Sequence, residues 1–391
     1  MKITKVEAFN CDAGWRPWTF VKIETDTGIT GWGECSDGRH PLGVAHSVRD
    51  FTHLLIGKDP RPVELLYWDM IRTARQNPLG VSHKAIAGIE LALWDIKARA
   101  LGVPVYELFG GPTRDRMRLY WSHCGTTRAR HAAELGLPEL RSMDDIKKLG
   151  AEVKSRGFTA LKTNIVFPGN PARVYFAGFD AGPNTTDGTV TPEILDHIET
   201  QIAAFSEGAG PNIQIALDLN YNFRFEAAVK IARRLEKFNM QWIEYDTWEP
   251  GSLRSLKEST TNTIASLESV IGARQYKPFL DLRATDVAII DVPWNGFGES
   301  VRIGRLAELY DVTVAPHNYY SHLADLHSIQ LCAVLPNVRV MEIDIDDVPW
   351  KQTLVTNPPR IENGHIYLPT GPGWGTDINE DVLRAHPWPK Q

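Results

Sequence analysis

The chain has 391 residues, 43% of them hydrophobic and 23% charged, and a formal net charge of −6 at pH 7. This composition is typical of a folded protein with more than one domain, and it excludes the strongly basic surface that attracts nucleic acid or an anionic membrane. The four cysteines form no Cys-x-x-Cys pair, so the sequence indicates neither a zinc site nor a disulfide framework. Because the pattern shows no signal peptide and no membrane-length apolar run, we expect a cytoplasmic protein that acts on a small molecule.

The N-terminal region predicts an antiparallel sheet. Residues 3–9, 20–25 and 29–34 alternate between apolar and polar side chains as the strands of a meander do. Two loops rich in glycine, tryptophan and proline, which contain Trp15 and His40, follow the first and third of these strands. Such loops can cover a substrate site, although the ends of ordinary hairpins also carry them.

The clearest helix of the sequence is predicted for residues 82–100. Its apolar residues recur at steps of three and four, Ser82 can cap its first turn, and a glycine and a proline follow its last turn. The run Gly110-Gly111-Pro112-Thr113 then interrupts the pattern. We therefore assign residues 1–112 to an N-terminal α+β domain.

Residues 113–350 alternate between strand and helix patterns. Eight short apolar runs are strand candidates, at residues 117–121, 159–163, 213–218, 241–244, 263–267, 287–290, 312–315 and 338–341. Helical patterns fall between them, for example at 142–156, 191–205, 224–237, 299–309 and 322–334. Eight strands in such an alternation predict a closed β/α barrel rather than an open sheet. The last residues, 351–391, carry one strand candidate at 365–368, and we expect them to pack back on the N-terminal domain.

An unusually long connection, residues 167–190, separates the second predicted barrel strand from its helix. It is rich in glycine, proline, asparagine and threonine. Connections of this length are uncommon unless they have a function, so this one could cover the site, although an insertion without a function fits the pattern equally well.

Three of the predicted barrel strands lead directly into an acid. These acids, Asp218, Glu244 and Glu268, lie 26 and 24 residues apart, which is about one strand, loop and helix. Because the carboxyl ends of consecutive parallel strands line one mouth of a barrel, we expect the three acids to meet there. Each alone could be a salt-bridged strand end, but three together would repel one another unless a cation lay among them. Oxygen ligands suit a hard divalent ion, so we expect one Mg²⁺.

Several motifs, taken together and in order, resemble the mandelate racemase and muconate-lactonising branch of the enolase superfamily. They are the helix Ala85 to Arg99 with Gly102-Val103-Pro104-Val105-Tyr106, Leu161-Lys162-Thr163-Asn164, Asp218-Leu219-Asn220, Trp242-Ile243-Glu244, Glu268, Asp291, Ala315-Pro316-His317 and Glu342. The resemblance covers nearly the whole chain. It implies a capping domain made from both chain ends over a (β/α)7β barrel, in agreement with the patterns above.

The resemblance also implies the metal ligands and the base. Asp218, Glu244 and Glu268 would hold Mg²⁺, which binds the carboxylate of an acid substrate. His317 would remove the proton next to that carboxylate, because the family pairs a histidine and Mg²⁺ for this purpose. Asp291 would bind one nitrogen of the imidazole and leave the other free for proton transfer.

Two further residues receive roles from the resemblance. Lys162 matches the first lysine of the family's Lys-x-Lys motif, and it would hold the substrate carboxylate or lower a neighbouring pKa by its charge. A solvated lysine at a strand end is the plainer interpretation. Glu342 matches an acid that donates a hydrogen bond to the substrate carboxylate, so we expect its carboxyl group to be protonated. A salt-bridged acid is the alternative.

The chain departs from the family pattern at Asn164, at Asn220 and at Tyr245, where relatives commonly carry a second glutamate. Asn164 stands where the second lysine is the usual base, and because an amide cannot take up a proton, a racemase with lysine and histidine bases is not expected. The Lys-x-Asn pattern and the segment Gly371-Pro372-Gly373-Trp374-Gly375 are similar to galactonate dehydratases, but Asn220 replaces the second histidine of that group. The expected substrate-binding residues are Asn164, Asn220, Trp15, His40 and Tyr319.

We therefore expect a Mg²⁺-dependent dehydratase of a sugar acid, an aldonate or an aldarate, that forms an enediolate and expels the C3 hydroxyl to give a 2-keto-3-deoxy acid. His317 could act alone in a syn elimination, or a second group could come from a loop, with Tyr319, Tyr320, His322, Tyr175, Arg173 and His40 as candidates. The alternatives are an epimerase, racemase or cycloisomerase on a similar carboxylate and a catalytically silent binding protein. We expect no nucleic-acid or membrane partner, and assembly as a homo-oligomer.

Overall fold

A three-stranded antiparallel sheet begins the chain in this computed structural model, which describes residues 1–77, 79–176 and 187–389. Its strands are β1 (Ile3–Asp12), β2 (Pro17–Thr25) and β3 (Thr30–Glu34), in that order across the sheet. The turn between β2 and β3 contains Gly28 with φ +80°, a backbone conformation that glycine adopts without strain. The predicted meander is therefore present.

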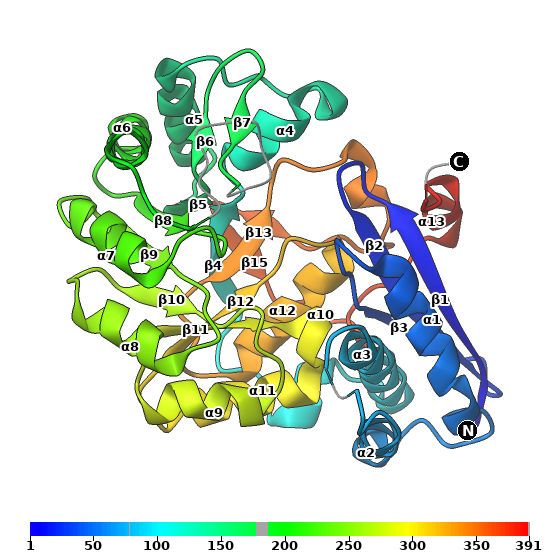
Figure 1. The fold of residues 1–391 in the computed structure, drawn as a ribbon. Coiled ribbons are helices and arrows are strands. Elements are labelled where there is room, and N and C mark those ends of the chain that lie inside the picture. Colours follow the sequence, from blue (N-terminus) through cyan, green and yellow to red (C-terminus); the bar gives the residue numbers. More distant parts are fainter. Residues whose placement is uncertain (78, 177–186, 390–391) are drawn as a thin grey trace.

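Helices α1 (Pro41–Phe51) and α3 (Val81–Leu101) pack on this sheet, and α2 (Val63–Thr73) packs against α3 (Figure 1). Helix α3 is the one predicted from the apolar spacing. The backbones of α3 and β3 come unusually close. A Cβ atom at Gly33 would lie 2.1 Å from the carbonyl oxygen of Gly88, and one at Gly31 would lie 2.2 Å from that of Ala92. Only glycine fits at these strand positions, so the close contact of helix and strand depends on them.

Gly33→Ala is expected to destabilise the protein by about 3 kcal/mol or more, because two backbones would have to separate to admit the methyl group. Gly43→Ala is the matched control: a Cβ there meets only Val81 Cγ1 at 3.6 Å and His40 Cβ at 3.8 Å, and alanine favours the helix that contains it. Urea unfolding followed by circular dichroism measures both variants. Equal stability of the two variants would contradict the close contact.

In the described part of the chain, eight parallel strands form the barrel. They are β4 (Arg116–Ser122), β5 (Ala160–Thr163), β8 (Gln214–Asp218), β9 (Met240–Glu244), β10 (Ile264–Ser266), β11 (Val287–Asp291), β12 (Thr313–His317) and β13 (Met341–Asp344). Hydrogen bonds join β4 to β12 in this order, β13 pairs with β4, and a bridge from Val314 to Val338 links the chain before β13 to β12. The fold is thus a (β/α)7β barrel beside an α+β capping domain (Figure 1).

Helices surround the barrel in Figure 1. They are α4 (Thr126–Leu135), α5 (Met143–Ser155), α6 (Pro192–Ala209), α7 (Phe225–Arg234), α8 (Pro250–Glu258), α9 (Ala273–Asp281), α10 (Val292–Asn295), α11 (Phe297–Glu308) and α12 (His322–Val334). A buried cluster of mostly small and branched side chains fills the barrel interior, with Tyr120 and Trp242 in edge-to-face contact at 5.3 Å between ring centroids. The interior is therefore packed, and the chemistry has to lie at its mouth.

The eighth strand differs from the sequence prediction. It was expected at residues 338–341 but spans Met341–Asp344, so Glu342 lies within the strand rather than after it. Val338 contributes only a single bridge, because residues 335–337 still belong to the turn that follows α12. The apolar run at residues 338–341 therefore lies mostly before the strand.

Buried carboxylates join the capping domain to the barrel. Glu90 of α3 accepts hydrogen bonds from the backbone N–H groups of Phe297 and Gly298, both at 2.8 Å. Glu34, at the end of β3, accepts hydrogen bonds from the hydroxyl and the backbone N–H of Ser321. These contacts hold the loop that follows β3 close to the barrel mouth.

The C-terminal segment contacts both parts of the molecule. Its strand β15 (His365–Tyr367) pairs antiparallel with β4, while the backbone N–H of Trp374 donates to Asp95 of α3 at 3.0 Å. Helix α13 (Glu380–Ala385) lies beside β1 in Figure 1. Among the helices of the described residues, none has both the length and the apolar character that a membrane crossing requires.

Candidate active site

The parallel register of the barrel brings the sequence-predicted acids and histidine to one mouth. Asp218 and Glu244 are directly opposite in the ladder of β8 and β9, and Asp291 and His317 are opposite in that of β11 and β12. Glu268 follows β10 by two residues. All of these side chains therefore come from the carboxyl ends of neighbouring strands.

His317 and Asp291 form a tight pair. The imidazole Nδ1 lies 2.6 Å from Asp291 Oδ2, and the same oxygen accepts a hydrogen bond from the Tyr320 hydroxyl at 2.6 Å. The other ring nitrogen, Nε2, lies 3.4 Å from Glu268 Oε2. Asp291 and Tyr320 thus fix the orientation of the ring, and Nε2 points toward the acids.

The pKa of His317 follows from these neighbours. Burial lowers it, but the negative charges of Glu268, Glu342 and Asp291 outweigh burial and raise the pKa of His317 to about 10. A cation bound to the acids would weaken this attraction and favour the neutral imidazole, which is the form that can act as a base.

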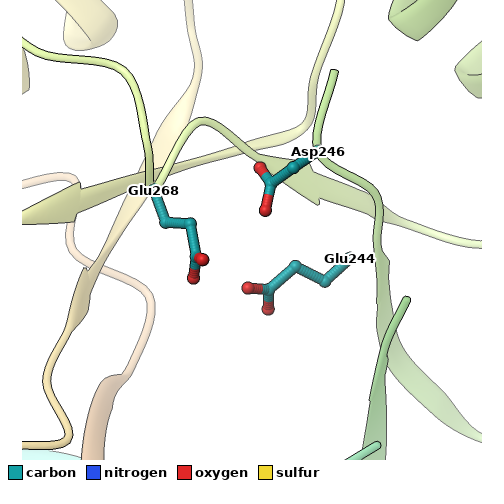
Figure 2. Close-up of side chains that lie close together, drawn as sticks. All are labelled: Glu244, Asp246 and Glu268. Carbon is teal, nitrogen blue, oxygen red and sulfur yellow. The ribbon is translucent and has the colours of Figure 1, made fainter. Parts of the chain in front are cut away.

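Three acids gather opposite His317, and one of them was not predicted. Oxygens of Glu244, Asp246 and Glu268 all lie within 4.8 Å of one another, and Figure 2 shows their carboxylates pointing toward a common point. Asp218 is not in this trio, although it faces the same cavity as Glu268. Asp246 could have been noticed in the sequence, because it follows Glu244 by two residues at the same strand end.

The donor set of this cluster fits a hard divalent cation. All candidate ligand atoms are carboxylate oxygens, which Mg²⁺ and Ca²⁺ prefer. Burial, followed by the charges of Glu268 and Asp218, raises the pKa of Asp246 to about 8, and the pKa values of Asp218 and Glu244 are also raised, mainly by burial. The acids therefore lack enough positive charge around them to be fully ionised, and a bound cation would supply it.

Lys162 is the cation that the structure places among the acids. Its Nζ lies 3.0 Å from Glu342, 3.2 Å from Glu244 and 3.9 Å from Asp218. Although burial alone would lower it, these carboxylates raise the pKa of Lys162 well above its ordinary value. The lysine is therefore buried and charged, not solvated at a strand end.

Glu342 differs from its predicted ionisation state. It accepts hydrogen bonds from the Ser122 hydroxyl and, at 2.8 Å, from the Asn318 backbone N–H. Burial would raise its pKa, but the charges of Lys162 and His317 lower the pKa of Glu342 below the ordinary range. The protonated carboxyl expected from the sequence is thus not favoured, because the fold places a buried ammonium beside it.

A cavity of about 380 Å³ lies between the barrel mouth and the capping domain. Of the sequence-predicted residues it is lined by Lys162, Asn164, Asp218, Asn220, Glu268, His317, Tyr319 and His40. Trp15 is not in the lining, but its ring stacks 6.1 Å from that of Tyr319. Asn164 accepts a hydrogen bond from the Thr126 hydroxyl at 2.8 Å, so this amide is held by the fold.

The candidates for a second catalytic group lie in different places. Tyr319 and His40 line the cavity, whereas the Tyr320 hydroxyl binds Asp291. His322 is buried against Asp325, with Nδ1 2.7 Å from the carboxylate, and Tyr175 stacks on Phe223 at 5.2 Å. Arg173 lies exposed on the short strand β7 (Arg173–Val174) and is not in the cavity lining.

Only part of the long connection 167–190 is described. Phe176 lines the cavity, and Val166–Phe167 (β6) pairs with β7 in a small antiparallel sheet. Residues 177–186 lie outside the described part of the chain, so a covering role for the whole connection stays a prediction.

Sequence reasoning missed several residues of the cavity wall. His123, Arg130, Lys84 and Asp37 line it, and Lys84 Nζ pairs with Asp37 at 2.7 Å. The sequence indicated only His123, and weakly, because it directly follows the first barrel strand, where a side chain can reach the mouth.

A larger cavity of about 790 Å³ lies nearby, but its walls are mainly apolar and none of the acids or His317 lines it. The chemistry therefore belongs to the smaller cavity.

Comparison with known proteins agrees with this architecture. Residues 13–110 match the family model of the mandelate racemase and muconate-lactonizing enzyme N-terminal domain, and residues 145–382 match that of the enolase C-terminal domain-like family. A D-xylonate dehydratase of Haloferax volcanii is 28% identical over 98% of this chain and 89% of its own length. A D-gluconate dehydratase of Thermoproteus tenax is 30% identical over 96% of this chain and 71% of its own length.

Among solved structures, a protein described as a "putative L-alanine-DL-glutamate epimerase" from Burkholderia xenovorans is 39% identical, with a TM-score of 0.95 over 99% of this chain and 98% of that one. A second structure under this description is bound to magnesium and fumarate, with the same identity and TM-score over 99% and 96% of the two chains. Fold and site together define a β/α-barrel enzyme with a capping domain. The chain belongs to the enolase superfamily, in the branch of mandelate racemase and the muconate-lactonising enzymes, and its named relatives include hydro-lyases.

Proposed function

We propose that the protein is a Mg²⁺-dependent dehydratase of a sugar acid, an aldonate or an aldarate, that removes the C2 proton and the C3 hydroxyl to give a 2-keto-3-deoxy acid. The observation that carries this proposal is the position of His317, held by Asp291 through Nδ1 while Nε2 lies 3.4 Å from Glu268. Removing a proton next to a carboxylate creates a dianion, which needs preorganised positive charge beside the base. A cluster of acids able to hold a cation at that place supports this chemistry.

Asp218, Glu244 and Glu268 are the proposed ligands of the metal ion. Asp218 and Glu268 line the cavity, and Glu244 is opposite Asp218 in the strand ladder and lies 3.2 Å from Lys162 Nζ. When bound there, Mg²⁺ would supply the charge that stabilises the enediolate. The related structure with magnesium and fumarate supports a divalent ion and a small carboxylate as the ligands.

The residues of the chain would divide the proton chemistry between them. His317 Nε2 takes the C2 proton, and Asp291 stabilises the imidazolium that results. Lys162 brings a buried positive charge to the wall of the cavity, where it would attract the substrate carboxylate. Asn164 cannot accept a proton, so this position offers no second base. A single base at C2 favours elimination over racemisation.

The dehydratase proposal predicts a direct result in a substrate panel. With Mg²⁺, at least one of D-gluconate, D-galactonate, D-xylonate, D-glucarate and galactarate is expected to give a keto acid, read as semicarbazone absorbance. Treatment with EDTA is expected to abolish the product, and added Mg²⁺ to restore it, because the enediolate is not stabilised without the ion. A panel without any keto acid would contradict the dehydratase proposal for these acids.

An epimerase is the second candidate, because the Burkholderia xenovorans relative carries that description. An epimerase would take up deuterium at C2 from heavy water without forming a keto acid.

Cytoplasmic location and homo-oligomeric assembly also stay predictions. Light scattering after gel filtration tests the oligomeric state.

A further inference from the structure

A second histidine–aspartate pair lies at the wall of the same cavity, and the chemistry described above does not use it. His123 follows β4 directly, and Asp344 ends the neighbouring strand β13, opposite Ser122 in the parallel ladder. His123 Nδ1 lies 2.9 Å from Asp344 Oδ1. This arrangement repeats that of Asp291 and His317 at the ends of β11 and β12.

The geometry leaves the second nitrogen of His123 available to a ligand. Because Nδ1 faces Asp344, Nε2 lies on the opposite edge of the ring, and the side chain, 21% exposed, lines the cavity together with His317. The Tyr319 ring contacts both imidazoles, with centroid distances of 5.6 Å to His123 and 5.1 Å to His317. A substrate deprotonated by His317 would therefore occupy the cavity whose wall His123 also forms.

The backbone and the surrounding rings hold His123 in this place. Its φ is +46°, in the left-handed region that a residue with a side chain rarely adopts. The ring packs edge-to-face against Trp15 at 5.8 Å, and Arg16 lies 3.3 Å from the Asp344 carboxylate and so helps to keep it ionised. Strained conformations of this kind persist where neighbouring groups fix them, and they are frequent at functional sites.

We propose that His123 is the general acid of the dehydration, which donates the Nε2 proton to the leaving C3 hydroxyl; the inference rests on the proposed function. His317 first takes the C2 proton, and the electron pair of that C–H bond forms the enediolate. The C2–C3 double bond then forms as the C3–O bond breaks, and the His123 proton joins the departing oxygen to release water. The enol becomes the 2-keto-3-deoxy acid by losing its hydroxyl proton and gaining one at C3, and solvent resets both histidines.

Other donors suit this step less well. Burial raises the pKa of Tyr319 above its ordinary value, so its phenol is a weaker acid. His40 is 71% exposed, and its nearest carboxylate oxygen, on Asp37, is 3.9 Å away. His317 could return its own proton to the hydroxyl, and the experiment below distinguishes that route.

The experiment compares His123→Asn and His123→Gln with His131→Asn, a control histidine that stacks on Trp15 at 5.7 Å but is not in the cavity lining. Three rates are measured in the Mg²⁺-loaded enzyme: keto-acid formation from the panel acid with the fastest wild-type rate, deuterium exchange at its C2, and fluoride release from its 3-deoxy-3-fluoro analogue. Fluoride leaves without protonation, so its release does not need a general acid.

We expect both His123 variants to lose keto-acid formation by roughly 10² to 10⁴-fold, while C2 exchange and fluoride release stay within a few-fold of wild type. The control should keep all three rates. Unchanged keto-acid formation in the folded variants would overturn the proposal and favour proton return by His317, and parallel loss of all three rates would assign His123 a structural role instead. A wild-type enzyme that exchanges C2 protons without forming keto acid would refute the dehydratase function itself, a result separate from the comparison of variants.

Discussion

His317→Asn is expected to lower turnover on the order of 10⁴-fold, because the variant removes the proposed base, whose Nε2 lies 3.4 Å from Glu268. Asparagine is close in size and can still hydrogen-bond to Asp291, so the fold and the metal site should persist. Deuterium exchange at C2 should disappear together with keto-acid formation, since both begin with the same proton transfer. This shared loss separates the base from a residue that acts only on the leaving group.

Two further variants test whether the loss of turnover is specific to the His317 imidazole. Asp291→Asn keeps the imidazole but removes the charge that stabilises the imidazolium, so we expect a large loss of kcat with an altered pH profile. His46→Asn, on the surface of α1, should leave activity unchanged. Full activity of His317→Asn in a folded protein would refute the choice of base.

Asp218→Asn is expected to weaken Mg²⁺ binding by 100-fold or more, whereas Asp246→Asn should weaken it by about 10 to 100-fold. Both residues carry buried carboxylates near Glu244 and Glu268, but they face different spaces. Asp218 lines the cavity with His317, while Asp246 lines a separate cavity of about 480 Å³. One Asp246 oxygen already accepts hydrogen bonds from Ser266 and from the Leu267 backbone, both at 3.1 Å. Asp246 therefore suits a supporting position behind the ligands.

Isothermal titration with Mg²⁺ measures the affinities, and Glu226→Gln provides a control because this exposed acid pairs with Lys230 on the surface of α7. Loss of activity should follow loss of metal affinity in the Asp218 variant, and high Mg²⁺ should rescue the Asp246 variant. Equal loss of affinity in the two variants would place Asp246 in the ligand set. Unchanged affinity in the Asp218 variant would remove Asp218 from it.

The metal site and the base His317 are coupled electrostatically. Glu268, one of the proposed ligands of the ion, is also one of the acids that raise the pKa of His317. A bound cation therefore stabilises the product of proton transfer and also favours the neutral imidazole that begins it. This coupling explains why an acid cluster and a histidine at one barrel mouth form a functional unit.

The order of the elements and the identity of most of the chemical groups at the site follow from the amino-acid sequence alone. Asp218, Glu244 and Glu268 recur with the period of the β/α unit, and His317 follows a strand pattern after Ala315-Pro316. Alternation of side chains and the spacing of units are local properties, so they can be deduced from neighbouring residues. For the same reason the meander and helix α3 were predicted close to their observed bounds.

Which groups meet, and which charges they carry, depends on contacts between residues that are distant in the sequence. Glu342 was expected to be protonated, but Lys162 from another strand keeps it ionised. Asp246 joins Glu244 and Glu268, although the 24-to-26-residue period of the strand-end acids does not include it. His123 and Asp344 lie 221 residues apart in the chain and pair only because the first and last barrel strands are neighbours. Ionisation and proton transfer depend on distances of a few ångströms between residues remote in sequence, and those distances are set by the closure of the barrel.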